Sequence, residues 1–231
     1  MKLGILQTGR APEDMAQVHG DYDDLFKQLL AARGFEFVTY LVLDGVLPSA
    51  PEACDGWIIT GSRFGVYEDH AWIPPLEDFI RQSYSVGVPI VGVCFGHQII
   101  AQALGGKVEK FSGGWSCGAV TYSGIKSNQA SYTVMAWHQD QVVSLPQDAE
   151  VIGRSDFCPY AMLAYGDKIL SIQPHPEFSA DFLRDLLAAR GHLLPDEIAS
   201  LTRSSLAKPL DTGSMANMFE SFFKRPRSRL A

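Results

Sequence analysis

The sequence of 231 residues lacks the features that would assign it to several large classes of protein. No hydrophobic run approaches the roughly 20 residues that a membrane span needs. The first ten residues, MKLGILQTGR, do not contain the hydrophobic stretch of a signal peptide. With 19 basic and 26 acidic residues, the formal net charge is −7, which argues against a broad nucleic-acid-binding surface. We therefore expect a protein that binds neither membranes nor nucleic acid.

Cysteine is also scarce. The four cysteines are Cys54, Cys94, Cys117 and Cys158, and they are widely spaced, without a CxxC pair or the Cys/His spacing of a zinc site. This pattern predicts reduced thiols, no structural metal and a cytoplasmic location.

The residues that are present favour one globular α/β unit. Hydrophobic side chains make up 46% and charged side chains 19% of the sequence, which is typical of a globular domain. In the first half, short apolar runs that predict buried strands alternate with helix-like segments. The predicted strands are 2–7, 35–42, 56–60 and 88–93, and the predicted helices are 20–33, 74–85 and 98–104. This alternation predicts a parallel sheet covered on both faces.

The second half of the sequence has a different pattern, with several short strands in succession. Short strands predicted at 117–122, 131–137, 149–154, 159–165 and 168–173 indicate an antiparallel extension of the sheet. Helices are predicted at 181–190, 195–206 and 215–224. The expected fold is doubly wound and flavodoxin-like, with a mixed central sheet and helices on both faces. We expect a main domain over residues 1–185 and a C-terminal helical extension, 186–231, that packs on or beside it.

The clearest motif lies where a predicted strand meets a helix. Residues 92–96 have the sequence GVCFG, the glycine–x–nucleophile–x–glycine pattern of a nucleophile elbow, with Cys94 in place of serine. In such a strained turn, the residues two positions before and two positions after the nucleophile lie against neighbouring backbone. Only glycine fits at these two positions. The start of the helix favours a thiolate and aims the N–H of Phe95 at an oxyanion beside the sulfur. Cys94 is therefore a candidate nucleophile; the alternative is a structural cysteine in a glycine-flanked turn.

A cysteine nucleophile needs a base, and His175 is the strongest of six histidines. It follows a buried strand, and Pro176 forces an extended path on which residues 175 and 177 project to the same side. Glu177 can then orient the imidazole and stabilise its charged form. His138 is a second candidate, whereas His97, in the elbow helix, points away from Cys94 and is expected to have a packing role.

Together, GVCFGHQ at residues 92–98 and QPHPE at residues 173–177 resemble the motifs of the class I, triad-type glutamine amidotransferase family. Versions of this domain occur in GMP synthase and carbamoyl-phosphate synthetase. The resemblance covers roughly residues 1–185, and the two motifs lie in the family's order, about 80 residues apart. The segments ITGS at 59–62 and VYED at 66–69 resemble the free-standing, GMP-synthase-like branch.

The resemblance implies a role for each matching residue. Cys94 corresponds to the nucleophile, His175 to the acid/base and Glu177 to its orienting partner, while the N–H groups of Gly61 and Phe95 form the oxyanion hole. The residues implied to hold the α-amino and carboxylate end of the substrate are Gln98, Trp137, His138, Gln139 and Asp140. The chain departs from the family where Thr60-Gly61-Ser62 replaces Gly-Gly-Pro and Gln139 replaces a glycine, and both departures affect substrate fit more than the triad.

The implied reaction is hydrolysis of a γ-glutamyl amide through a glutamyl thioester, with release of ammonia or an amine and no metal or organic cofactor. No P-loop is present, and about 50 residues after the triad are too few for a synthetase domain. The chain therefore either passes ammonia to a separate synthetase subunit or acts alone on glutamine, other γ-glutamyl amides or γ-glutamyl peptides. A catalytically idle binding or regulatory protein is a third hypothesis, against which the intact Cys–His–Glu set argues.

Overall fold

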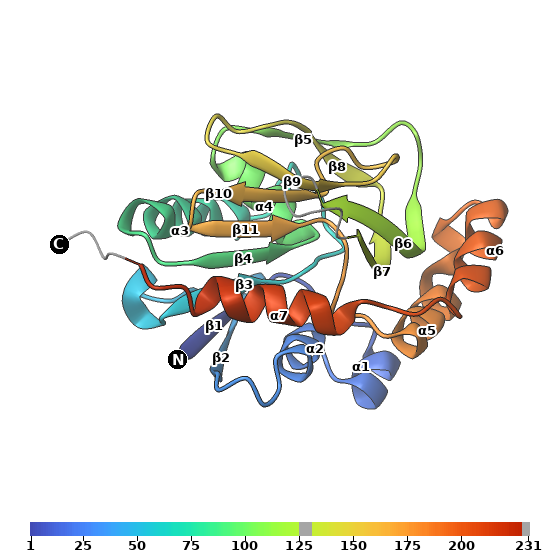
Figure 1. The fold of residues 1–231 in the computed structure, drawn as a ribbon, viewed down its shortest axis with the longest axis horizontal. Helices are drawn as coiled ribbons and strands as arrows, with labels where there is room; N and C mark the ends of the chain where they lie inside the picture. Colours follow the sequence, from blue (N-terminus) through green and yellow to red (C-terminus); the bar gives the residue numbers. More distant parts are fainter. Residues whose placement is uncertain (125–130, 228–231) are drawn as a thin grey trace.

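The computed structural model describes residues 1–124 and 131–227, and its main feature is a nine-stranded sheet (Figure 1). Five parallel strands form one part of the sheet, in the order β2 (Glu36–Leu41), β1 (Lys2–Gln7), β3 (Gly56–Ile59), β4 (Ile90–Val93) and β11 (Ile169–Ile172). The antiparallel part continues with β10 (Met162–Tyr165), β9 (Glu150–Arg154), β6 (Ser116–Gly124) and β7 (Ser131–His138). The predicted parallel core with an antiparallel extension is confirmed.

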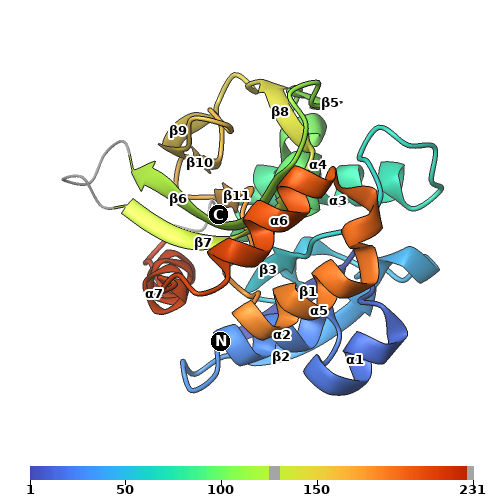
Figure 2. The same cartoon turned by 90° about the vertical axis from the view of Figure 1, so that its right-hand side faces the viewer.

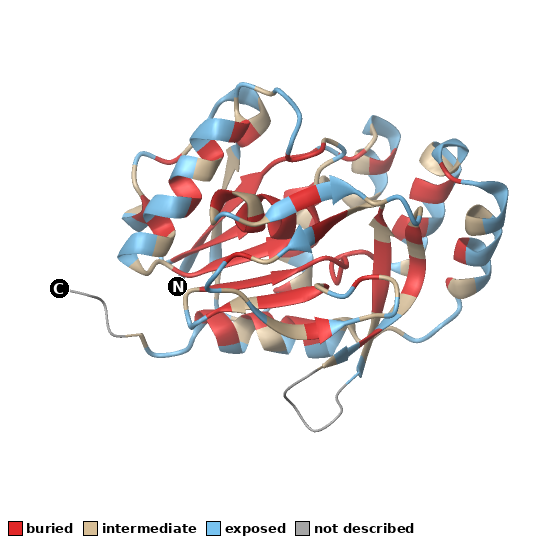
Figure 3. Cartoon of the chain, turned by 90° about the horizontal axis from the view of Figure 1, so that it is seen from above, coloured by how far each residue is buried: buried red, intermediate tan, exposed pale blue. Residues whose placement is uncertain are grey.

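Helices cover both faces of the sheet. They are α1 (Glu13–His19), α2 (Tyr22–Leu29), α3 (Ile73–Val86), α4 (Phe95–Ala103), α5 (Ala180–Arg190), α6 (Asp196–Ser205) and α7 (Thr212–Phe223). Helices α3 and α4 pack on one face, and α2 and α7 pack on the other. All residues of β3, β4 and β11 are consequently buried, which explains why these strands are continuous apolar runs (Figure 3). The predicted doubly wound α/β fold is confirmed.

A third group of helices lies at the carboxyl edge of the parallel strands. Helices α1 and α5 share a hydrophobic cluster that includes Met15, Phe182 and Leu206, the residue directly after α6, and α5 and α6 lie side by side (Figure 2). This cluster borders the segments that leave β1 and β11. It therefore walls one side of the edge at which ligands bind in doubly wound folds.

Three local features differ from the sequence prediction. The helix predicted over 20–33 ends at Leu29, because Ala32 and Gly34 take positive φ and turn the chain toward β2. The short helix α1, which begins after Pro12, was not predicted. Neither was the two-stranded sheet of β5 (Lys107–Lys110) and β8 (Asp140–Ser144), since only one residue of β5 is buried and the segment lacks an apolar pattern.

The C-terminal segment shares its core with the first strand. Met215 and Phe219 of α7 are completely buried in the same cluster as Leu3 and Ile5 of β1. The predicted boundary at residue 186 falls inside α5, and residues 228–231 of the predicted extension lie outside the described residues. The division into a main domain and an extension stays a prediction. Among the described helices, none has the length and apolar character to cross a membrane.

Candidate active site

Cys94 occupies the turn between β4 and α4. Its backbone has φ 53° and ψ −105°, a left-handed conformation that is strained for a residue with a side chain. A Cβ on Gly92 would lie 2.5 Å from the carbonyl oxygen of Gly96, and a Cβ on Gly96 would overlap the carbonyl of Ile59 in the adjacent strand. These close approaches are the steric reason for both glycines. Helix α4 begins directly after Cys94, three residues earlier than predicted.

His175 lies beside Cys94 at the end of β11. Its backbone N–H donates to the carbonyl of Met135 at 2.7 Å, and this bond ties the extended segment to β7. Its Nδ1 is 2.6 Å from Oε1 of Glu177, and its ring stacks on Phe178 with 4.0 Å between ring centroids. Cys94 is close enough to this imidazole for its charge to act on it. The structure therefore brings together the three residues predicted as a triad.

The charges around His175 outweigh its burial. Burial alone would lower the pKa of this imidazole, but the charges of Glu177 and Cys94, with the hydrogen bond to Glu177, raise its pKa above the ordinary value. His138, the second candidate base, has its pKa lowered to about 3 by burial and by the nearby charge of His175. Because its Nδ1 lies 3.2 Å from the carbonyl of Asp140, a neutral His138 donates there. His175 is thus the histidine that carries a proton beside Cys94.

Two residues whose backbone N–H groups were predicted to form an oxyanion hole lie next to Cys94 and His175. Phe95 opens helix α4, and Gly61 follows β3, where a Cβ would lie 2.9 Å from Cε1 of His175 and 3.7 Å from Cβ of Cys94. Across residues 1–124 and 131–227, neither N–H is used in a hydrogen bond. Free donors beside a sulfur nucleophile are the requirement for an oxyanion hole.

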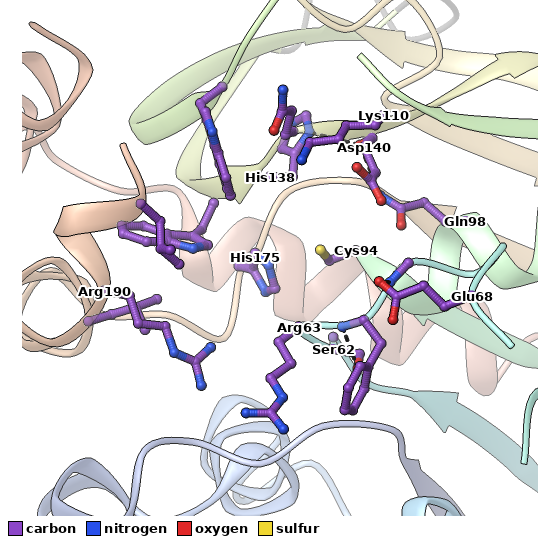
Figure 4. A pocket seen from close by; sticks show the side chains of 18 of the residues that line it. Ser62, Arg63, Glu68, Cys94, Gln98, Lys110, His138, Asp140, His175 and Arg190 are labelled. Carbon is purple, nitrogen blue, oxygen red and sulfur yellow. Dashed lines mark hydrogen bonds between the residues drawn. The ribbon is translucent and has the colours of Figure 1, made fainter. Parts of the chain in front are cut away.

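A cavity of about 210 Å³ opens above Cys94 and His175 (Figure 4). The five residues predicted to bind substrate all line it: Gln98, Trp137, His138, Gln139 and Asp140. The amide nitrogen of Gln98 donates to the carbonyl of Asp140 at 2.9 Å and to Gln173 at 3.1 Å. Gln98 therefore holds the start of β8 in place and presents only its amide oxygen for further contacts. The side chain of Gln139 donates to the carbonyl of Phe111 at 3.2 Å.

Several residues of the cavity were not predicted. Tyr67 donates from its hydroxyl to Oδ2 of Asp140 at 2.9 Å, and burial together with this carboxylate raises the pKa of Tyr67 to about 12. Others in the lining are Tyr22, Arg63, Glu68, Lys110 and Arg190. Residues 62–68 follow the carboxyl end of β3, the edge at which ligands bind in doubly wound folds. This position could have indicated Arg63, Tyr67 and Glu68 as cavity residues. No sequence signal marks Tyr22 or Arg190, which come from helices α2 and α5.

Comparison with known proteins decides the family. Residues 19–187 match the sequence model of class-I glutamine amidotransferases. The chain belongs to the class I glutamine amidotransferase family. This confirms the family predicted from the elbow and the QPHPE motif.

Members of the family resemble this chain over different lengths. Gamma-glutamyl peptidase 4 of Arabidopsis thaliana is 30% identical over 232 residues, which cover 93% of this chain and 92% of the relative. The GMP synthase (glutamine-hydrolyzing) of Streptococcus mutans is 31% identical over 170 residues, which cover 68% of this chain but 32% of the relative. Among solved structures, a glutamine amidotransferase from Thermotoga maritima aligns with a TM-score of 0.78 at 19% identity, covering 97% of this chain and 99% of the other. That similarity concerns the fold alone.

Proposed function

We propose that this protein hydrolyses the γ-glutamyl amide bond of γ-glutamyl peptides, with Cys94 as the nucleophile. The observation that carries the proposal is the placement of Cys94 beside His175, itself hydrogen-bonded to Glu177, at the floor of an accessible cavity. An activated thiol, a base that it contacts and a carboxylate that orients the base are the parts of a nucleophilic hydrolase.

The first half of the reaction forms a thioester. His175 takes the proton of Cys94 before the attack, and the sulfur then attacks the γ-carbonyl carbon as a thiolate. The N–H groups of Gly61 and Phe95 stabilise the oxyanion of the tetrahedral intermediate. The imidazolium, held by Glu177, then gives its proton to the leaving nitrogen as the C–N bond breaks.

The second half releases glutamate. Water attacks the thioester carbon while His175 accepts a proton from it. The C–S bond breaks, glutamate leaves, and the thiol regains its proton from His175. The proposed steps need only groups of this chain and water.

The cavity beyond Cys94 suits the polar end of a γ-glutamyl group. Asp140 and Glu68 offer carboxylates for an α-ammonium group, and Lys110 offers a cation for the α-carboxylate. Gln98 steadies this region through the carbonyl of Asp140. We propose that these residues, with Trp137, His138 and Gln139, bind the glutamyl part of the substrate.

The length of the similarity favours a peptidase. The relative named gamma-glutamyl peptidase 4 matches this chain almost end to end, whereas the match to the GMP synthase is confined to one third of that protein. The second candidate is a subunit that hydrolyses glutamine and supplies ammonia to a separate synthetase, and the 31% identity to the GMP synthase over 170 residues favours it.

Glutamate release from a panel of glutamine and γ-glutamyl dipeptides tests the proposal. The wild-type protein should hydrolyse at least one dipeptide faster than glutamine, and Cys94→Ala should abolish turnover. Cys117→Ala is the matched control, because burial raises the pKa of the Cys117 thiol to about 12 and keeps it protonated.

Two outcomes would overturn the proposal. Turnover retained by Cys94→Ala would refute the nucleophile. Hydrolysis of glutamine alone would favour the ammonia-supplying subunit.

A further inference from the structure

Two guanidinium groups line the active-site cavity without a carboxylate partner. Arg63 follows the oxyanion-hole segment and is exposed, and Arg190 ends helix α5 and is half-buried. Within the described part of the chain, neither forms an ion pair with Asp or Glu. Figure 4 shows both side chains extending into the same open region beside His175. The charge of Arg63 helps to lower the pKa of Glu68, whereas Arg190 has only the neutral Tyr22 beside it, so an anion in this region would be stabilised chiefly by Arg190.

Arg190 lies beside Tyr22, whose ring belongs to the aromatic group around His175. The charge of Arg190 acts on the Tyr22 hydroxyl. The Tyr22 ring lies 6.2 Å from that of Phe178, which stacks on His175. Burial raises the pKa of Tyr22 to about 12, so the phenol is neutral and leaves the charge of Arg190 uncompensated.

The direction of proton transfer tells which part of the substrate reaches these arginines. His175 gives its proton to the leaving nitrogen, so the leaving group must lie on the imidazole side of the scissile bond. In Figure 4, Arg190 lies on that side, whereas Gln98, Asp140 and Glu68 lie on the far side of Cys94. The arginines are therefore placed to contact the leaving group rather than the glutamyl group.

We infer that Arg190, assisted by Arg63, binds a carboxylate at the end of the leaving group. Guanidinium groups bind carboxylates through paired, charge-assisted hydrogen bonds. The inference rests on the proposed function and narrows its substrates to γ-glutamyl peptides with a free C-terminal carboxylate. The indole of Trp115 and the side chains of Leu186 and Leu193 line the same cavity and offer apolar contacts to the residue that leaves. Ammonia, the product of glutamine hydrolysis, has no negative charge for such a site to bind.

A matched pair of substrates tests the inference. We compare kcat/KM for γ-glutamyl-alanine and γ-glutamyl-alanine amide, which differ only in the terminal carboxylate. The wild-type protein should prefer the free acid by about 10- to 100-fold, the range expected for hydrogen bonds to a charged group. Arg190→Gln should remove most of this preference, chiefly through KM, and Arg190→Lys should restore part of it. Arg63→Gln should reduce it less, because Arg63 is the more exposed.

The control is Arg184→Gln, which removes a cation from the exposed side of the same helix, where it pairs with Asp181. It should leave both substrates unaffected. Equal kcat/KM for acid and amide in the wild type, or equal losses on both substrates in Arg190→Gln and Arg63→Gln, would overturn the carboxylate site while the γ-glutamyl hydrolase proposal stands. Absence of hydrolysis of either substrate would overturn both.

Discussion

The region around His175 and the region around His97 and His138 are both deeply buried but differ in charge. His97 contacts Ser171 Oγ at 2.9 Å, and burial, together with His138, lowers its pKa to about 3. His175 has Glu177 at 2.6 Å and Cys94 beside it, and its pKa is raised instead. Burial without a negative charge in contact therefore yields a neutral histidine. A carboxylate and a thiol in contact reverse the direction and yield a histidine able to donate a proton.

The largest expected effect comes from replacing one histidine in each of the two regions. His175→Asn should reduce kcat by about 10³-fold or more, because base, acid and thiol partner are lost together. His138→Asn should cost at most about tenfold, the worth of one neutral hydrogen bond to the carbonyl of Asp140. The measurement is glutamate release under saturating substrate. Equal losses in the two variants would contradict the contrast between the regions.

Removing only the negative charge of Glu177 tests whether that charge raises the pKa of His175. Glu177→Gln keeps the shape and one hydrogen bond but removes the negative charge, so the pKa of His175 should fall and kcat should drop by about 10²- to 10⁴-fold. NMR titration of the His175 ring measures the first effect and steady-state kinetics the second. Glu150→Gln, on the exposed start of β9, is the charge-matched control. An unchanged titration of His175 would show that Glu177 does not set its charge.

The interaction between His175 and Glu177 also predicts how the stability of the fold depends on pH. Because the pKa of His175 is raised in the folded state, its favourable contribution is complete below the unfolded value of about 6.5. As the pH rises from there toward the folded-state pKa, the folded protein binds more protons than the unfolded chain. The free energy of unfolding should therefore fall, by up to about 1.4 kcal/mol per pH unit from this group.

Urea unfolding between pH 6.5 and 9 measures this slope, and the wild type should show a steeper decline than Glu177→Gln. Parallel curves for the two proteins would contradict the prediction.

The smallest expected effect concerns the region around His97. Ser171→Ala removes the hydrogen-bond partner of His97 Nδ1 and leaves that buried nitrogen unpaired, so it should destabilise the fold by about 1–3 kcal/mol. The catalytic constant should stay within about twofold of wild type, since the variant leaves the contacts of His175 intact. Ser83→Ala, whose hydroxyl bonds only the carbonyl of Phe79 in its own helix, is the matched control for stability. A large loss of kcat in Ser171→Ala would link the two regions.

The sequence alone predicted much of the fold because its signals are local. The parallel strands are apolar runs, and the elbow at Cys94 has a glycine wherever a Cβ would meet backbone. QPHPE likewise predicted that His175 and Glu177 share one side, since Pro176 restricts the chain to an extended path. Helix ends were less certain: the end of α2 depends on a positive φ at Ala32, a residue that does not favour it.

Tertiary structure decided what lies around Cys94, His175 and Glu177. Local pattern could not show that the last residue of α5 meets Tyr22 of α2, or that β5 pairs with β8 and sets Asp140 beside Tyr67. Local sequence pattern also could not predict which histidine is charged, because the pKa of a buried histidine depends on which groups the fold brings into contact with it. The residues that could act in catalysis were therefore predicted from sequence, whereas their protonation and the meeting of Arg63 and Arg190 at one cavity follow from packing between distant segments.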